Sequence, residues 1–308
     1  MKAAICTGYG PPEVLKIREV KEPRLRANGV RIRVHATSVT ASDSLVRSLR
    51  FGGWRRYLVR VAFGVRAPRV IMGMIASGEV EAVGRNVTKF KAGDQVFGMD
   101  GFRAGTYAEI VCWPASTVLA LKPSNLSFAE AAAIPYGGLL ASFFLRKLDV
   151  RAGQRVLVYG ASGAIGTAAV QLARHRGAVV TGVCSTANVE LVRSLGATAV
   201  VDYTKDDFVK AGPFDVIFDA VGRRKSAQAM ASSDAALAPN GVSMSVDDTF
   251  PRSTPADLLT LKELAESGAL RPVIDRTFAL EDIVEAHRYV DQGHKKGNVI
   301  VTVDAKGL

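Results

Sequence analysis

The segment that most constrains the fold is QRVLVYGASGAIGTAAVQLARHRG, residues 154–177. It opens with a continuous apolar run, which predicts a buried strand. Gly160, Gly163 and Gly166 follow, and the apolar residues after them recur with helical period until a stop signal at Gly177. A strand, a glycine-rich turn and a helix in this order predict one βαβ unit.

The three glycines have the spacing G-x-x-G-x-x-G, which differs from the dinucleotide fingerprint G-x-G-x-x-G. Glycines let the backbone turn tightly and approach a pyrophosphate closely. The helix that follows offers free N–H groups and a positive dipole to that anion. A tight turn without any ligand is the alternative. Because the turn lies between a strand and a helix, the sequence favours a dinucleotide site.

Strand and helix patterns continue to alternate after this unit. Strands are predicted at AVVTGV, AVVD and FDVIFDAVG, and a helix at NVELVRSLG. This alternation predicts an α/β fold with a doubly wound parallel sheet of Rossmann type.

The first 122 residues have a different character, because short strand patterns dominate them. In VRIRVHAT apolar and polar residues alternate, which predicts a half-buried strand with His35 on its solvated face. A small β unit, a barrel, fits this region. Near the C-terminus LEDIVEAHRYVDQG predicts an amphipathic helix whose His287 is better explained as a core residue than as a catalytic one, and GNVIVTV predicts a closing strand.

The chain of 308 residues carries a net charge of +11, and its densest basic stretch runs from Arg47 to Arg69. Arginines alternate there with aromatic residues. A nucleic-acid or membrane-surface patch is one interpretation. The other, which we favour, is an amphipathic lid over residues 51–66 with a solvated arginine face, since no RNA- or DNA-binding motif accompanies the patch.

The three cysteines, Cys6, Cys112 and Cys184, are far apart, which predicts no disulfide framework and a reducing, cytoplasmic setting. No run of about 18 apolar residues is present, so no membrane span is expected. The N-terminal residues lack the apolar stretch of a signal peptide.

Motifs along the whole chain resemble one enzyme family. They include MKAAICTGYGPPEVLKIREV, GEVEAVGRNVTKFKAGDQVFG, AAAIPYGGLLASFFL, VLVYGASGAIGTAAVQLA, FDVIFDAVG and AHRYVDQGHKKGNVIV, in that order. The chain is similar to the medium-chain dehydrogenase/reductases, in the zinc-independent quinone oxidoreductase (zeta-crystallin-like) branch. The resemblance implies a GroES-like β-barrel catalytic domain, residues 1–122 and 276–308, and a Rossmann nucleotide-binding domain, residues 123–275.

Zinc-dependent members of this family hold a catalytic zinc with a Cys on the segment matching TSVTASD, with the His of a Gly-His-Glu run and with a later ligand. This chain has Thr40, Ala41 and Ser42 in the first place, and Met74 and Ile75 in the second. A structural zinc lobe needs four closely spaced cysteines, which are absent. We therefore expect no metal. Without a Lewis acid to lower an alcohol pKa, reduction of an electrophilic quinone or enone is the expected reaction.

NADPH is the expected cofactor. NAD enzymes of this architecture carry an Asp or Glu at the end of the second strand, where this chain has Cys184. Ser185, Thr186 and the N–H groups that open the next helix can donate to a 2′-phosphate, although relatives often have Arg where Ala187 stands. Lys205 or Lys296 is a possible source of positive charge. The full set expected to bind the cofactor, part of it by resemblance, is Gly160, Ser162, Gly163, Ala164, Ile165, Gly166, Ser185, Thr186, Tyr203, Val221, Lys296 and Asn298.

The sequence gives few indications of which residues are catalytic. Thr40 and Tyr136 are candidate proton donors or oxyanion partners, and Tyr57 is a candidate substrate contact. Packing or local hydrogen bonding is the alternative for Thr40 and Tyr136, and an amphipathic surface position for Tyr57.

Three departures from the family pattern affect the nicotinamide pocket: Ile75 where relatives keep an acidic residue, Leu140 where they often have Thr, and Asp247 where they usually have glycine. Beyond residue 246 the chain also lacks the segment that relatives use for dimerisation, which predicts a monomer or an atypical homodimer. The alternative function is an NADPH-binding protein with a non-enzymatic role, for instance in RNA binding.

Overall fold

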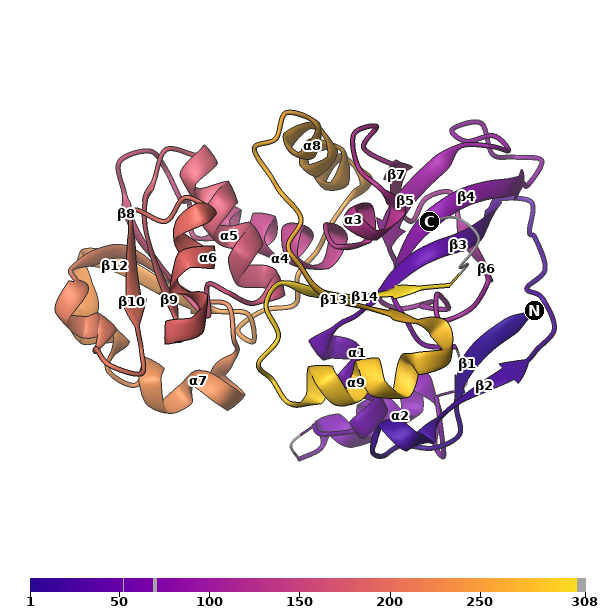
Figure 1. Cartoon of the computed structure of the whole chain (residues 1–308), viewed down its shortest axis with the longest axis horizontal. Coiled ribbons are helices and arrows are strands. Elements are labelled where there is room, and N and C mark those ends of the chain that lie inside the picture. Colours follow the sequence, from indigo (N-terminus) through magenta and orange to yellow (C-terminus); the bar gives the residue numbers. More distant parts are fainter. Residues whose placement is uncertain (52, 69–70, 304–308) are drawn as a thin grey trace. The chain divides into compact units, whose positions relative to one another are not determined.

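A computed structural model describes residues 1–51, 53–68 and 71–303 (Figure 1). The chain divides into two compact units, Met1–Pro135 with Ile274–Leu308, and Tyr136–Val273. The first boundary lies later than the expected 122/123. The reason is that α3 (Phe128–Ala132) packs against strands β3 and β4 and therefore belongs to the first unit.

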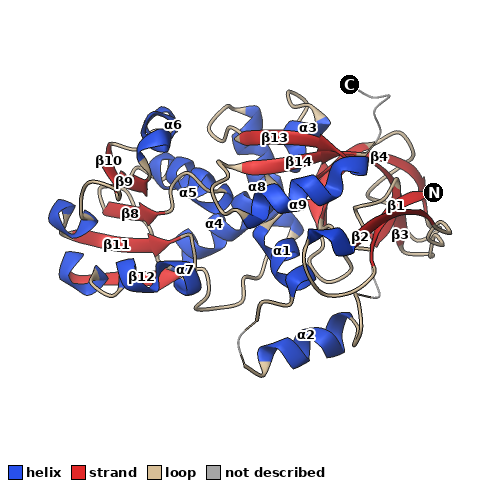
Figure 2. Cartoon of the chain, turned by 60° about the horizontal axis from the view of Figure 1, so that its bottom comes forward, coloured by secondary structure: helices blue, strands red, loops and turns tan. Residues whose placement is uncertain are grey.

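The second unit contains a parallel sheet with the strand order β10-β9-β8-β11-β12 (Figure 2). The sheet is parallel, as predicted, and numbered in chain order its strands run 3-2-1-4-5, the order of a dinucleotide-binding fold. The edge strand β12 was not among the predicted strands. The strands are β8 (Arg155–Tyr159), β9 (Val179–Cys184), β10 (Ala199–Asp202), β11 (Phe214–Asp219) and β12 (Leu237–Ser245).

Helix α5 is buried more completely than a single apolar face requires. Every residue from 164 to 173 is buried, including Thr167 and Gln171. Gln171 is satisfied by the backbone of Arg271, from which it accepts and to which it donates a hydrogen bond. The helices of this unit are α4 (Pro135–Lys147), α5 (Ala164–His175), α6 (Val189–Ser194), α7 (Arg223–Met230) and α8 (Pro255–Glu266), with short 3₁₀ turns η2 (Thr186–Asn188), η3 (Phe208–Ala211) and η4 (Ser233–Ala236).

The first unit is organised around the long strand β3 (Gly29–Val39). One half of β3 pairs with β4 and β6, and the other half pairs with β14 and β4, so the C-terminal segment returns to this unit as the resemblance implied. The remaining strands are β1 (Lys2–Cys6), β2 (Leu15–Glu19), β4 (Ile75–Val83), β5 (Gln95–Met99), β6 (Ile110–Pro114), β7 (Val118–Leu121), β13 (Ile274–Ala279) and β14 (Asn298–Thr302).

Helices also belong to this unit, so it is not purely β. They are α1 (Ala41–Ser48), α2 (Arg55–Phe63), α3 and α9 (Ile283–Asp291), with 3₁₀ turns η1 (Pro12–Val14) and η5 (Leu280–Asp282). The apolar face of α9 closes one core together with β1 and β14.

His35 and His287 differ from each other in their surroundings. His287 lies in the core, as predicted, and Arg47 donates to its Nδ1 at 3.2 Å. His35 is not the solvated surface residue that the strand pattern indicated. Its ring stacks on Phe128 of α3, with centroids 4.4 Å apart, because α3 covers this part of β3.

The stretch Phe128–Lys147, which spans α3 and α4, has the length and apolar composition to cross a membrane, with a mean hydropathy of 1.4 over an 18-residue window. Within the structure 67% of it is buried. That burial is typical of a core helix in a globular protein, which passes the same test of length and composition.

Candidate active site

The glycine turn joins β8 to α5, and two of its glycines are required by geometry. Gly160 has φ +76°, and a Cβ there would lie 2.3 Å from a methyl of Val221. A Cβ on Gly166 would lie 2.1 Å from the carbonyl oxygen of Gly160, so the helix approaches the strand end at this point. Gly163 differs, because its φ is −79° and a Cβ there would meet nothing closer than 3.5 Å.

The space beside Gly163 faces the start of α5, which suits an anion. No side chain caps this helix, and its first turn carries no acidic residue. The first N–H groups of a helix have no partner within the helix, so those of Ala164, Ile165 and Gly166 are available as donors. The residues present therefore fit the pyrophosphate of a dinucleotide.

Asn188 ties the glycine turn to the end of the next strand, a role that the sequence analysis missed. Its amide nitrogen lies 3.2 Å from the hydroxyl oxygens of both Ser162 and Ser185, to which it donates. Asn188 is itself buried. Asn188 therefore fixes the spacing between the glycine turn and the Ser185 loop. The first is expected to contact the pyrophosphate, and the second the ribose of the adenosine.

The region at the ends of β9 and β10 differs in two ways from the prediction. Cys184 is 1% exposed, and burial together with the nearby Asp202 raises the pKa of its thiol to about 11, so its side chain does not face a ligand. Thr186 donates its hydroxyl hydrogen to Asp202 at 2.5 Å and is not free to donate to a phosphate. Asp202 is a carboxylate that the sequence analysis did not consider at this site.

Asp202 is held in its ionised form. Hydrogen bonds from Thr186 and Thr204 lower its pKa to about 2, and Lys205 lies 3.6 Å away. Tyr203 is 53% exposed beside these residues, and its N–H donates to the carbonyl of Cys184. The predicted Ser185, Thr186, Tyr203 and Lys205 thus come together at these strand ends, around a negative charge.

A second buried carboxylate supports the loop after β11. Asp219 accepts hydrogen bonds from the N–H groups of Val221 and Gly222 and from the hydroxyls of Ser226 and Ser245, the last two at 2.6 and 2.7 Å. This network positions Val221 against Gly160. Asp219 belongs to the predicted strand that ends in FDAVG, but only the fold shows which groups donate hydrogen bonds to it.

The start of α4 lies against the glycine turn. A Cβ on Gly137 would be 2.1 Å from the carbonyl oxygen of Ala164, so the two helix starts are in close contact. Tyr136 precedes this contact and is 8% exposed, and Leu140 follows it by three residues. Both therefore lie on the helix that flanks the predicted dinucleotide site.

Asp247 and Asp248 form a turn at the end of β12. Asp248 binds the guanidinium of Arg223 in a bidentate pair at 2.6 and 2.9 Å and accepts from the N–H of Ser245. Asp247 is exposed, and a Cβ on Gly222 would lie 2.7 Å from its carboxylate. One of the two carboxylates is therefore structural, and the other lies beside the loop that carries Val221.

Thr40 occupies a structural position in the first unit. It caps α1, and its N–H and hydroxyl both donate to the carboxylate of Asp43, at 2.9 and 2.7 Å. Burial raises the pKa of Asp43 to about 6. Near neutral pH the hydroxyl hydrogen of Thr40 is therefore directed at a carboxylate.

The remaining predicted residues also lie in the first unit. Ile75 is fully buried at the start of β4. Tyr57 is 55% exposed on α2. Lys296 is exposed, and its N–H donates to Asp275, while Asn298 is buried at the start of β14.

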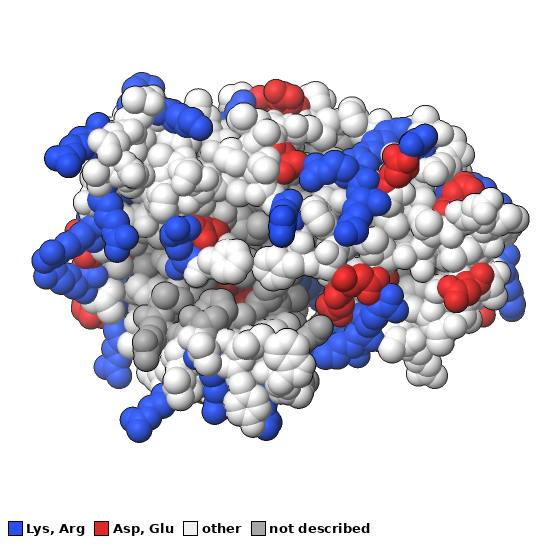
Figure 3. Space-filling model, turned by 180° about the vertical axis from the view of Figure 1, so that it is seen from behind, with Lys and Arg blue, Asp and Glu red and all other residues white. Residues whose placement is uncertain are grey.

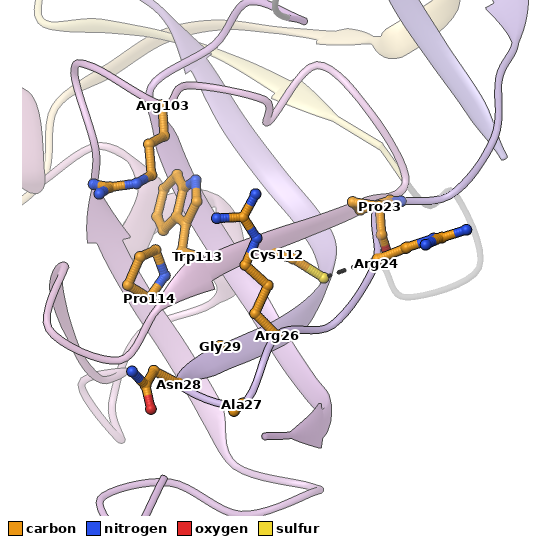
Figure 4. Close-up of a pocket in the computed structure, with 10 residues that line it drawn as sticks. All are labelled: Pro23, Arg24, Arg26, Ala27, Asn28, Gly29, Arg103, Cys112, Trp113 and Pro114. Atoms are coloured by element: carbon orange, nitrogen blue, oxygen red, sulfur yellow. Dashed lines mark hydrogen bonds between the residues drawn. The ribbon is translucent and has the colours of Figure 1, made fainter. Parts of the chain in front are cut away.

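A pocket of about 710 Å³ opens on the first unit and contains none of the predicted site residues (Figure 4). Cys112 in its wall donates its thiol to the carbonyl of Pro23 at 3.7 Å, and burial raises the pKa of that thiol. A protonated thiol is a poor nucleophile, so the pocket offers no catalytic group of this kind. Its lining is Pro23, Arg24, Arg26, Ala27, Asn28, Gly29, Arg103, Cys112, Trp113 and Pro114.

Known proteins match the chain over nearly its whole length. Residues 26–123 match the alcohol dehydrogenase GroES-like domain, and residues 164–284 match the family described as zinc-binding dehydrogenase. A 2-methylene-furan-3-one reductase of Solanum lycopersicum is 32% identical over 98% of this chain and 79% of its own. The chain belongs to the medium-chain dehydrogenase/reductase superfamily. Members of this superfamily are nicotinamide-dependent oxidoreductases.

Other similar proteins are named as oxidoreductases or dehydrogenases. The NADPH-dependent alkenal/one oxidoreductase of Arabidopsis thaliana is 30% identical to this chain over 98% of it and 79% of the relative. The solved quinone oxidoreductase of Coxiella burnetii superimposes with a TM-score of 0.86 at 28% identity, covering 99% of both chains. A solved NAD-dependent alcohol dehydrogenase superimposes with a TM-score of 0.84 at 27% identity, covering 99% of this chain and 100% of the other.

The second family description names zinc, whereas this chain has Thr and Met at the two ligand positions that the resemblance identifies. The matched segment, 164–284, includes neither Thr40 nor Met74, the positions where the resemblance places zinc ligands of other members. Throughout the described part of the chain, no three His, Cys, Asp or Glu residues are grouped as metal ligands.

Proposed function

We propose that this chain is an NADPH-dependent, metal-free reductase that transfers hydride to a quinone or to an α,β-unsaturated carbonyl compound. The observation that carries the proposal is the uncapped start of α5 beside Gly163, at the end of the central strand β8. The names of the tomato, Arabidopsis and Coxiella relatives support the reaction class.

The chain's own residues would hold the cofactor by its phosphates. The N–H groups of Ala164, Ile165 and Gly166 bind the pyrophosphate, and Val221, positioned by the Asp219 network, packs beside the turn. When bound, NADPH supplies the hydride. Asn188 keeps the Ser185 loop at the correct distance from this turn.

Preference for NADPH over NADH follows from what surrounds Ser185. The Ser185 hydroxyl and the ammonium of Lys205 can bind a 2′-phosphate, whereas the ionised Asp202 disfavours it. Since the Lys205–Asp202 pair is 3.6 Å long and Lys205 is exposed, that ammonium can turn toward a phosphate. We therefore expect a moderate preference for NADPH.

The acceptor follows from the residues at the positions of the zinc ligands. Thr40 and Met74 are not zinc ligands, so no Lewis acid is expected to activate an alcohol oxygen there. Quinones and enones accept hydride at carbon, and their oxygen then needs one proton. Because Thr40 donates to Asp43, the phenol of Tyr136 is the donor to test first.

A screen of NADPH and NADH oxidation with quinones, enones and aldehydes tests the proposal. We expect NADPH oxidation with a quinone or an enone, unchanged after extensive chelation. Tyr136→Phe should lower kcat roughly a hundredfold at unchanged NADPH affinity. Absence of turnover with every acceptor, or activity that is lost on chelation and restored by zinc, contradicts the proposal.

A further inference from the structure

Helix α2 lies in a long segment without acidic residues. Between Asp43 and Glu79 the sequence contains seven arginines and no Asp, Glu or Lys. Two of the seven, Arg47 and Arg50, pair with Asp291, so a local positive field comes from the arginines nearer to α2.

The apolar side chains of α2 face solvent. Trp54, Tyr57, Leu58 and Val61 follow the spacing i, i+3, i+4, i+7, which places them on one side of the helix. They are 68%, 55%, 54% and 80% exposed. A surface helix normally turns such a stripe toward the core. Figure 2 shows α2 set apart from the other helices and strands of its unit.

The helix is nevertheless attached to the first unit at its C-terminal end. Tyr9 donates its hydroxyl to the carbonyl of Gly64 at 2.7 Å, and the guanidinium of Arg60 lies over the Tyr9 ring. These contacts leave the four apolar side chains of the stripe exposed. The contacts with Tyr9 therefore hold the helix to the unit while the stripe faces solvent.

Cationic side chains border the stripe. Arg56 and Arg66 are exposed, and among the described residues no carboxylate lies within ion-pair distance of Arg56, Arg60 or Arg66. At the lower margin of Figure 3, where α2 lies, the coloured side chains are blue and none is red. The partner that fits this surface is negatively charged.

We propose that α2 docks this protein on the surface of an anionic lipid bilayer. The apolar stripe enters the boundary between headgroups and acyl chains, and Arg56, Arg60 and Arg66 remain at the level of the phosphates. RNA fits less well, because Leu58 and Val61 can neither stack on bases nor donate hydrogen bonds to them. The helix lies on the membrane and does not cross it, since it has nine residues.

Sedimentation of the full-length protein with lipid vesicles tests the proposal. We expect binding to vesicles of phosphatidylcholine mixed with phosphatidylglycerol, weak binding to phosphatidylcholine alone, and release by salt. Tryptophan emission gives a second measurement. Of the two tryptophans, Trp113 is 1% exposed, so a blue shift on vesicle binding reports Trp54, and Trp54→Phe should abolish it.

Matched variants separate the charged and apolar contributions. Arg56→Gln with Arg66→Gln should weaken binding roughly tenfold to thirtyfold, since each surface cation contributes about fivefold. The control, Arg18→Gln with Arg85→Gln, removes two exposed charges elsewhere and should change binding little. Leu58→Ser should weaken binding about tenfold, whereas Leu259→Ser, at a similarly exposed position on α8, should not.

Three results would overturn the proposal. The first is equal binding by the α2 variants and their controls, which makes vesicle binding a property of net charge alone. The second is binding to a single-stranded oligouridylate, weakened by the arginine variant, without binding to anionic vesicles. The third is a shift of Trp54 emission on addition of NADPH and a quinone, again without vesicle binding, which identifies α2 as a lid.

Discussion

Thr186 and Asp202 show at the scale of single residues how local contacts change the expected phosphate site. The hydroxyl hydrogen of Thr186 is used by Asp202, and Cys184 is buried, so an Asp placed at position 184 would be a buried charge and would report on folding. Ala187 is exposed on the same loop, which makes it the better position for a test of cofactor preference.

Ala187→Arg should raise the ratio of NADPH to NADH affinity about tenfold to hundredfold. A guanidinium at this position supplies the charged partner that the loop lacks, and a charge-assisted hydrogen bond contributes roughly 1.5–3 kcal/mol. Dissociation constants for both cofactors, measured by fluorescence titration, give the ratio. Ala187→Gln is the control for side-chain length. An unchanged ratio in Ala187→Arg shows that the phosphate lies elsewhere.

His287 makes the stability of the protein depend on pH. Burial and the neighbouring Arg47 lower its pKa to about 3. In the unfolded chain a histidine titrates near 6.5, so as the pH falls below that value the unfolded state takes up the proton first, and stability is lost toward pH 3. The free energy that His287 contributes should therefore fall by about 2 kcal/mol between pH 7 and pH 5.

Comparison with His287→Gln measures this contribution. The difference in unfolding free energy between the variant and the wild type, from urea titrations, should narrow by about 2 kcal/mol from pH 7 to pH 5. Asp43, whose pKa is raised to about 6, is present in both proteins and cancels. His175→Gln, at an exposed position, is the control. A difference in unfolding free energy that is equal at both pH values contradicts the lowered pKa of His287.

At the scale of elements, the turn between β8 and α5 contains one glycine that folding requires and another that the cofactor is expected to require. Gly166 is needed for the close approach of helix and strand, whereas Gly163 has ordinary backbone angles and free space beside it. Two substitutions of the same kind, three residues apart, therefore test two different properties.

Gly163→Ala should lower NADPH affinity at least tenfold and leave the thermal midpoint nearly unchanged, because its methyl enters the space expected for the pyrophosphate. Gly166→Ala should lower the thermal midpoint, because its Cβ meets a backbone oxygen at 2.1 Å. Calorimetry and cofactor titration give both quantities. Unchanged NADPH affinity in Gly163→Ala contradicts the proposed cofactor site.

At the scale of the whole molecule, the open edge of the parallel sheet bears on self-association. The edge strand β12 contains Pro239, which has no N–H, and Asn240 with φ +64°, and its register against β11 shifts at this point. Residues 246–254 form a turn and coil instead of a further strand. Irregular edges of this kind do not pair readily with another copy.

We therefore expect a monomer at micromolar concentration in light scattering coupled to size-exclusion chromatography. A dimer that persists on dilution and that is lost on substitution within residues 246–252 contradicts this expectation. A dimer insensitive to such changes indicates a different surface.

The sequence by itself determined the parallel sheet and the glycine turn, because period and glycine spacing act over short stretches of chain, whereas the return of the C-terminal strand was implied by the family resemblance. The tertiary structure decided that His35 stacks on Phe128, that Asp202 binds Thr186 and that the apolar stripe of α2 faces outward. A pattern shows which residues share a face of a helix or strand. What covers that face comes from segments far away in the chain, and periodicity carries no information about them.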